Sequence, residues 1–124
     1  MYSRIILMGR ITGDLELKRT PNRSEVLSFG LAVQRPYTTK NGERVTDFFN
    51  IVAWQAQAEF IAKYFKKGSL ILIEGRPETR EYIDKKGTTQ RIVEIVVEKA
   101  SFTGEKASQD VFKYKDIDNE DLPF

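Results

Sequence analysis

The sequence contains no cysteine and no histidine. Without cysteine, the chain can form neither disulfides nor thiolate metal sites. Without histidine, it lacks the commonest zinc ligand and the side chain that most often acts as a general base near neutral pH. A nucleophile would need a lysine or carboxylate base, and the carboxylates stand in no recognisable catalytic motif. The composition therefore favours a binding protein over an enzyme, and we expect no catalytic residue, no metal site and no cofactor.

Long apolar runs are missing as well. No stretch approaches the roughly 20 apolar residues that a membrane helix requires. The stretch MYSRIILMGR at the start of the sequence lacks the long apolar region and the small-residue cleavage site of a signal peptide. We therefore expect a cytoplasmic protein that has no membrane partner.

Charge is distributed unevenly along the chain, whose net charge is +2. Residues 1–103 carry 17 lysines and arginines against 12 acids, whereas residues 104–124 carry 3 against 6. A basic body with an acidic end suggests a polyanionic partner for the body. The excess of base is nevertheless ordinary for a soluble protein, so charge alone does not identify that partner.

The apolar pattern predicts extended strands over most of the chain. Asn41-Gly42 is a strong signal for a hairpin, and DKKG at 84–87 predicts a second hairpin loop. Gly9 predicts a bend or bulge in the first strand, and Gly75 and Pro77 predict a break in the fourth. The five expected strands cover residues 4–20, 26–36, 45–54, 69–83 and 88–102.

One segment, 55–68, changes to helical spacing. Its apolar residues recur every three or four positions, Lys66 and Lys67 fall in the expected last turn, and Gly68 stands where a C-cap belongs. The order β-β-β-α-β-β predicts an all-β protein with one helix. It is typical of the OB-fold, a five-stranded antiparallel barrel, here with the helix between strands three and four. We expect this domain to span 1–103, followed by a short linker at 104–115.

Aromatic residues stand beside basic ones at several points. Tyr37 follows Arg35, and Tyr82 lies between Arg80 and the pair Lys85-Lys86. Proteins that bind single-stranded nucleic acid combine aromatic platforms for the bases with basic grooves for the phosphates. The pattern therefore indicates nucleic-acid binding.

Each aromatic residue also has a plainer interpretation. Phe29, Phe49, Phe60 and Phe65 stand among apolar neighbours and are expected in the core. Tyr37 and Tyr82 stand at polar loop edges, where a solvated surface tyrosine needs no special explanation. Because side chains alternate along a strand, Phe48 and Phe49 must face opposite ways, so Phe48 is expected to face outward, together with Trp54. Lys66 and Lys67 are more simply read as favourable charges at a helix end than as nucleic-acid contacts.

The chain resembles the bacterial single-stranded DNA-binding protein family over essentially its whole length. The segments that carry the resemblance are RIILMGRITGDLELKRTPN, FGLAVQR, TDFFNIVAW, AEFIAKYFKKGSLILIEGR, TREYIDKKG and DNEDLPF, in that order. The resemblance implies a homotetramer around which single-stranded DNA wraps during replication, recombination and repair. It is compatible with a bacterial chromosomal protein, a phage protein or a secondary copy, and it implies a cytoplasmic, nucleoid-associated location.

The resemblance also assigns residues. It places base stacking on Tyr37, Phe48, Trp54 and Tyr82. Phosphate contacts are expected from the family or from basic neighbours at Arg4, Lys18, Arg35, Lys66, Lys67, Arg80, Lys85 and Lys86. The flexible acidic tail, 116–124, would recruit replication, recombination and repair proteins through Asp118, Glu120, Asp121, Leu122, Pro123 and Phe124.

Other interpretations remain open at this point. One is a specialised OB-fold module that binds RNA or primosomal proteins, although the acidic Pro-Phe end argues against it. A second is an adaptor domain whose aromatic residues bind protein. A third is a nuclease or another enzyme, which the missing motifs disfavour.

Overall fold

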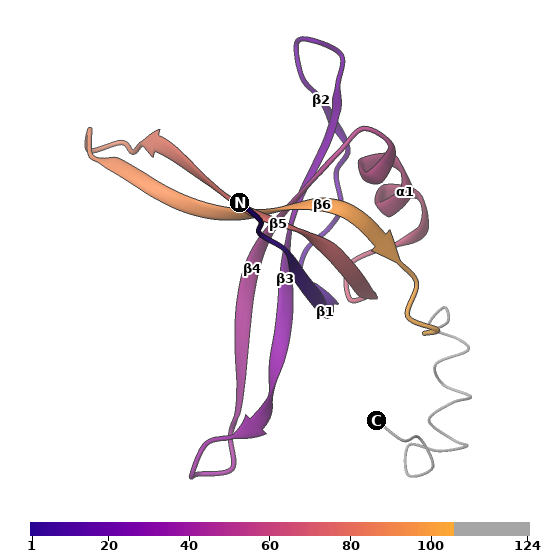
Figure 1. Cartoon of the computed structure of the whole chain (residues 1–124), viewed down its shortest axis with the longest axis vertical. Helices are drawn as coiled ribbons and strands as arrows, with labels where there is room; N and C mark the ends of the chain where they lie inside the picture. Colours follow the sequence, from indigo (N-terminus) through magenta and orange to yellow (C-terminus); the bar gives the residue numbers. More distant parts are fainter. Residues whose placement is uncertain (106–124) are drawn as a thin grey trace.

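The computed structural model describes residues 1–105, which form a twisted β-barrel with one helix and two projecting hairpins (Figure 1). The predicted acidic segment 116–124, and all of the linker beyond residue 105, lie outside the described residues. The elements are β1 (Ile5–Ile11), β2 (Lys18–Arg19), β3 (Glu25–Thr38), β4 (Arg44–Trp54), α1 (Ala56–Tyr64), β5 (Leu70–Ile83) and β6 (Thr89–Ser101).

The strands close into the predicted barrel. Their order is β1-β5-β6-β4-β3-β2, and an additional pairing of β1 with β3 closes the sheet on itself. All pairings are antiparallel except that of β4 with β6, where Ile51 lies opposite Ile95 in parallel register. Five of the strands are long, and β2 adds a sixth of only two residues. The helix follows the third long strand, as predicted, although β2 makes that strand the fourth in chain order.

Two glycines permit the close approaches that shape the barrel. Residues Arg10 and Ile11 of β1 pair with β3, and a Cβ at the preceding Gly9 would collide with the backbone carbonyl of Ala32. In β5 the register against β6 shifts between Glu74 and Gly75. β5 therefore continues through Gly75 as one strand with an irregularity, rather than breaking there.

Alternating side chains fill the barrel. The most deeply buried ones are aliphatic, which suits strands with one face turned inward. The helix contributes Ala58 and Ile61, both fully buried, and Phe65 follows it into the core. Phe29 is also buried, and Phe49 and Phe60 pack against the core, as the sequence predicted. The largest fully buried side chains are Ile11, Leu27, Leu31, Ile51, Ile61, Ile71 and Ile73.

The helix is shorter than predicted. It ends at Tyr64, because Phe65 adopts an extended backbone conformation that carries its side chain into the core. Gly68 is therefore not a helix cap. It has a φ of 89° in the following turn, where its N–H donates to the carbonyl oxygen of Ile11 at 2.8 Å. Lys66 and Lys67 accordingly lie in this turn and not in the last turn of the helix. Within residues 1–105, no helix is long and apolar enough to cross a membrane.

Two long hairpins project from the barrel in different directions (Figure 1). We call the β3–β4 hairpin from Val33 and Asp47 to its loop the first arm, and the β5–β6 hairpin from Arg76 and Val96 to its loop the second arm. Their loops contain Gly42 and Gly87, with φ of 79° and 80°, which confirms both hairpins predicted from the sequence. From Arg76 to Ile83 every residue of β5 is exposed, so the second arm has little apolar burial of its own.

Candidate nucleic-acid interface

The four aromatic residues singled out from the sequence are all exposed on strands. Tyr37 lies on the first arm and Tyr82 on the second, and their exposed fractions are 56% and 43%. Phe48 and Trp54 lie on β4, with exposed fractions of 73% and 43%. Large apolar rings are usually buried in a protein that has a core, so four on the outside provide stacking surface.

The alternation predicted for β4 is correct. Phe48 faces out, opposite Ala32 of β3, while Phe49 is partly buried against the core opposite Leu31. The six positions between Phe48 and Trp54 correspond to about 20 Å along an extended strand. The aromatic residues therefore do not converge on one pocket. They are distributed along β4 and out onto both arms, which suits an extended ligand better than a compact one.

The three predicted phosphate-binding arginines are held by carboxylates. Arg35 forms a two-bond pair with Asp47 across the first arm, with N–O distances of 2.8 and 2.9 Å. Arg80 pairs in the same way with Glu94 across the second arm, at 3.1 and 3.2 Å. Arg4, just before β1, pairs with Glu74 at 3.3 Å and lies 3.7 Å from Glu98. Hydrogen bonding to the carboxylates raises the pKa of all three guanidinium groups, and the bond from Arg35 lowers the pKa of Asp47.

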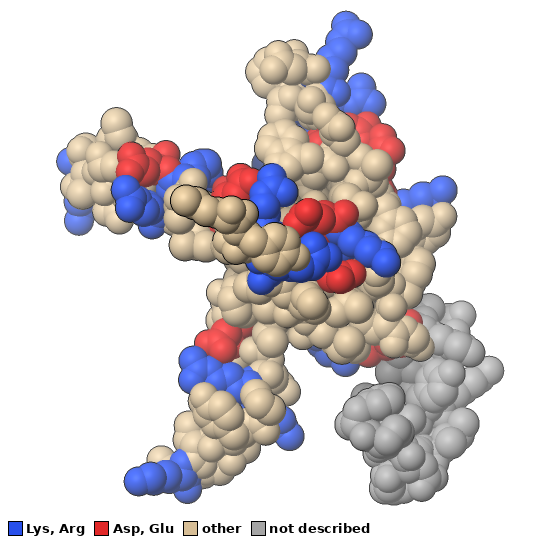
Figure 2. Space-filling model, in the orientation of Figure 1, with Lys and Arg blue, Asp and Glu red and all other residues tan. Residues whose placement is uncertain are grey.

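The predicted lysines are placed differently. None forms a salt bridge with any residue of the part that the structure describes, residues 1–105. Lys18 lies in β2, Lys66 and Lys67 in the turn after α1, and Lys85 and Lys86 in the loop of the second arm. Figure 2 shows basic side chains on both arms, with acidic ones set among them.

The loop that carries Lys85 and Lys86 is shaped by Asp84. Its carboxylate accepts hydrogen bonds from the backbone N–H groups of Lys86 and Thr88, both at 2.9 Å, and from the side chain of Gln90 at 3.1 Å. The bond from Thr88, followed by that from Gln90, lowers the pKa of Asp84. The carboxylate therefore stays ionised and holds a tight loop, with its two lysines at the tip of the arm.

Exposed rings on a barrel, combined with lysines that have no carboxylate partner in residues 1–105, suit a polyanion that carries flat bases. Comparison with known proteins agrees with this description of the surface. The model of the single-strand binding protein family matches residues 2–103.

The chain belongs to the single-strand binding protein family.

Curated relatives fit this assignment. The chain is 44% identical to a single-stranded DNA-binding protein of Halalkalibacterium halodurans over 109 residues, which cover 88% of this chain and 65% of the relative. It is 44% identical to single-stranded DNA-binding protein A of Bacillus subtilis, covering 82% and 59%. It is 46% identical to single-stranded DNA-binding protein 1 of Lactococcus lactis, covering 79% and 65%. The chain thus spans less than two thirds of the length of these three relatives.

In this member of the family, sequence reasoning missed the carboxylates that hold the arginines. A signal was available, because each predicted hairpin brings its two strands side by side. Val33 lies opposite Asp47, so Arg35, two residues further along β3, lies diagonally across from Asp47. On the second arm, Arg80 lies opposite Ile92, which places Glu94 diagonally across from Arg80. Side chains at such positions are within reach of each other.

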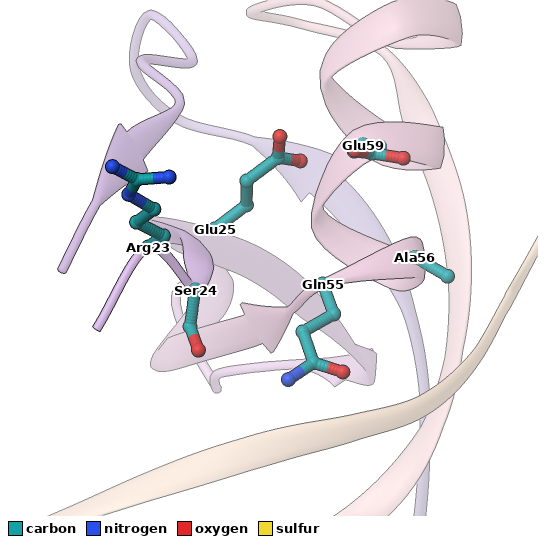
Figure 3. Close-up of a pocket in the computed structure, with 6 residues that line it drawn as sticks. All are labelled: Arg23, Ser24, Glu25, Gln55, Ala56 and Glu59. Atoms are coloured by element: carbon teal, nitrogen blue, oxygen red, sulfur yellow. The ribbon is translucent and has the colours of Figure 1, made fainter.

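A further unexpected feature of this family member is a hollow of about 260 Å³ between the turn before β3 and the start of α1 (Figure 3). Two of its lining residues, Arg23 and Gln55, have positive φ values of 65° and 52°. Glu25 and Glu59 come close together here, and hydrogen bonding between the two carboxyl groups raises the pKa of Glu59. Within residues 1–105, the Oε2 atom of Glu25 is the one buried side-chain polar atom without a hydrogen-bond partner.

The remaining predicted site residues of this family member belong to the acidic segment and lie outside the described part of the chain: Asp118, Glu120, Asp121, Leu122, Pro123 and Phe124. Within residues 1–105, no group of three or more carboxylates could hold a metal ion.

Proposed function

We propose that this protein binds single-stranded DNA with little sequence preference, acting as a binding protein and not as an enzyme. The observation that carries the proposal is the set of exposed rings on β4 and on both arms. Every base has a π-face, so stacking on Tyr37, Phe48, Trp54 and Tyr82 would accept any sequence. Duplex DNA keeps its bases stacked inside and offers no such partner.

The phosphates would be neutralised mainly by lysines. Lys18, Lys66, Lys67, Lys85 and Lys86 have no carboxylate to give up among residues 1–105. Arg4 and Arg80 are already paired, so a phosphate would have to share or displace a carboxylate. Each neutralised phosphate releases counterions, and the slope of log K against log salt should become more negative by about 0.7 per phosphate.

Titration of fluorescein-labelled oligo(dT) at several salt concentrations tests the proposal, with duplex DNA and oligo(rU) of equal length as comparisons. We expect tight, salt-sensitive binding of oligo(dT) and much weaker binding of duplex. Equal affinity for duplex, or a flat salt dependence, would contradict it. Preference for oligo(rU) would instead support the alternative of an RNA-binding module.

The wider role follows from the same activity. We propose that the protein covers single strands during replication, recombination and repair as a nucleoid-associated cytoplasmic homotetramer. Membership of the single-strand binding protein family supports this role.

We also propose that the acidic segment 116–124 recruits replication, recombination and repair proteins. Its acids would steer the encounter with a basic surface, and Phe124 would fill an apolar pocket on the partner. Phe124→Ala changes no charge, so it should leave oligo(dT) binding unaltered while reducing the capture of partner enzymes from a bacterial lysate. Identical sets of captured proteins for the variant and the wild type would contradict this role and favour a merely solubilising segment.

A further inference from the structure

The first arm contains a chain of side-chain contacts that ends on Tyr37. Asp47 on β4 accepts two hydrogen bonds from Arg35 on β3, from Nε at 2.8 Å and from Nη2 at 2.9 Å. The remaining terminal nitrogen of Arg35, Nη1, donates to the hydroxyl oxygen of Tyr37 at 3.0 Å. The guanidinium carbon also lies 6.0 Å from the centre of the Tyr37 ring. Arg35 is thus bound on one side by a carboxylate and on the other by an aromatic residue.

These contacts stand where the backbone ladder is interrupted. The register between β3 and β4 shifts between Gln34 and Thr38, and Arg35, Pro36 and Tyr37 have no register partner in that interval. Pro36 has no N–H to donate to a ladder. Tyr37 therefore has no register partner of its own in the ladder, and Arg35 donates a hydrogen bond to its hydroxyl group.

The second arm carries the same spacing without the same contact. Arg80 stands two residues before Tyr82, as Arg35 stands two before Tyr37. Arg80 pairs with Glu94, but its hydrogen bonds within residues 1–105 go to Glu94 alone and not to Tyr82. Around Tyr82 the register is regular, with Tyr82 opposite Gln90. The link from arginine to tyrosine therefore occurs on the arm whose ladder is interrupted.

We infer that Asp47 and Arg35 are positioning residues that hold the Tyr37 ring in place for base stacking, and that Arg35 is not itself a phosphate contact. Three of the five guanidinium N–H groups of Arg35 are already engaged, and its charge is matched by the carboxylate. A fixed ring has less rotamer freedom to lose when a base stacks on it, which favours binding. The inference rests on the proposed function, and it gives Arg35 a role different from the one expected from the sequence.

The key test compares two substitutions that each remove one negative charge from the same arm. Glu43 lies at the loop and forms no salt bridge within residues 1–105, so Glu43→Gln should leave oligo(dT) affinity unchanged or make it tighter. Asp47→Asn would do the same if charge alone mattered. If Asp47 positions Tyr37, Asp47→Asn should instead weaken binding, by about two- to tenfold for the loss of one or two hydrogen bonds. Asp47→Asn binding as tightly as Glu43→Gln would overturn the inference.

A double-mutant cycle separates positioning from general loosening of the arm. Tyr37→Phe keeps the ring but removes the hydroxyl group that Arg35 holds. If Asp47 acts through that bond, Asp47→Asn should have little further effect in the Tyr37→Phe background. An undiminished effect there would mean that Asp47 merely stabilises the arm, and the inference would fail.

Arginine substitutions complete the test. Lysine cannot hold a two-bond carboxylate pair and a hydroxyl group in the geometry of arginine, although it keeps the charge. Arg35→Lys and Arg35→Gln should therefore weaken binding alike, with salt slopes equal to that of the wild type. A phosphate contact would show the opposite: Arg35→Lys would keep the affinity, and Arg35→Gln would make the slope shallower by about 0.7. If the wild type did not prefer oligo(dT) over duplex, the proposed function itself would be refuted. The variants test only the role of Arg35 and Asp47, because their affinities are compared with that of a wild type that binds oligo(dT).

Discussion

Replacing Phe48 with alanine should reduce DNA binding and leave the fold almost intact. The neighbouring substitution Phe49→Ala removes the same atoms from the opposite face of β4 and is the matched control. Phe48 is 73% exposed, whereas Phe49 packs against the core. The two variants should therefore affect different properties of the protein.

The burial of Phe48 limits its contribution to stability. About a quarter of its surface is covered, and a phenylalanine side chain exposes on the order of 200 Å² when unfolded. At about 25 cal/mol per Å², the lost burial costs on the order of 1 kcal/mol. Phe49→Ala should cost more, about 2–3 kcal/mol, because it removes packed atoms from the edge of the core.

For DNA binding, Phe48→Ala should have the larger effect of the two substitutions. Loss of one base–aromatic stack costs about 1–3 kcal/mol, so Phe48→Ala should weaken oligo(dT) binding by about 5- to 150-fold. Fluorescence anisotropy with labelled oligo(dT) measures this, and urea unfolding measures stability. Wild-type affinity in Phe48→Ala would remove Phe48 from the interface. A larger loss of stability in Phe48→Ala than in Phe49→Ala would refute the assignment of the two faces.

Two further predictions concern the scaffold. A raised pKa for Glu59 means that the folded state holds its proton to higher pH than the unfolded chain, so stability should fall as pH rises from about 4 towards 7. Glu59→Gln should make stability depend less on pH in this range and should raise the melting temperature at neutral pH. If the melting temperature of Glu59→Gln fell with rising pH as steeply as that of the wild type, the result would count against the carboxyl pair. Gly75→Ala should destabilise by about 1–3 kcal/mol in urea unfolding, since its Cβ would meet the carbonyl oxygen of Val96. Gly13→Ala, with nothing within 4 Å of the new Cβ, is its control and should be nearly neutral.

Much of the fold could be predicted from local signals. Strand alternation separated Phe48 from Phe49, and Asn41-Gly42 located the first hairpin, because both signals depend on residues close together in the chain. The helix end was mispredicted, because Gly68 and two lysines form a good local stop signal. Burial of Phe65 ends the helix earlier. A tertiary contact thus prevailed over the local preference.

The exposed rings were easier to predict than their supports. Tyr37 could be singled out because it stands close to Arg35 in the sequence, and Phe48 because strand alternation turns it away from the side of Phe49. Asp47 was not named, because its role depends on which residue lies across the hairpin. The contact between Glu25 and Glu59 joins β3 to α1 through packing. No local pattern in the sequence indicates that contact.

Salt should affect both the stability of the arms and the contacts with DNA phosphates, and a DNA titration measures the two effects together. The arms have few buried apolar residues, and the second arm is held across its strands by ion pairs of Arg80 with Glu94 and of Arg91 with Glu81. Such exposed pairs contribute only about 0–1 kcal/mol each, and salt weakens them. Salt would also weaken the proposed phosphate contacts of the loop lysines, Lys85 and Lys86. Part of any salt slope measured on the whole protein therefore reports the loosening of the arms, and only substitutions that leave those pairs intact measure the phosphate contacts alone.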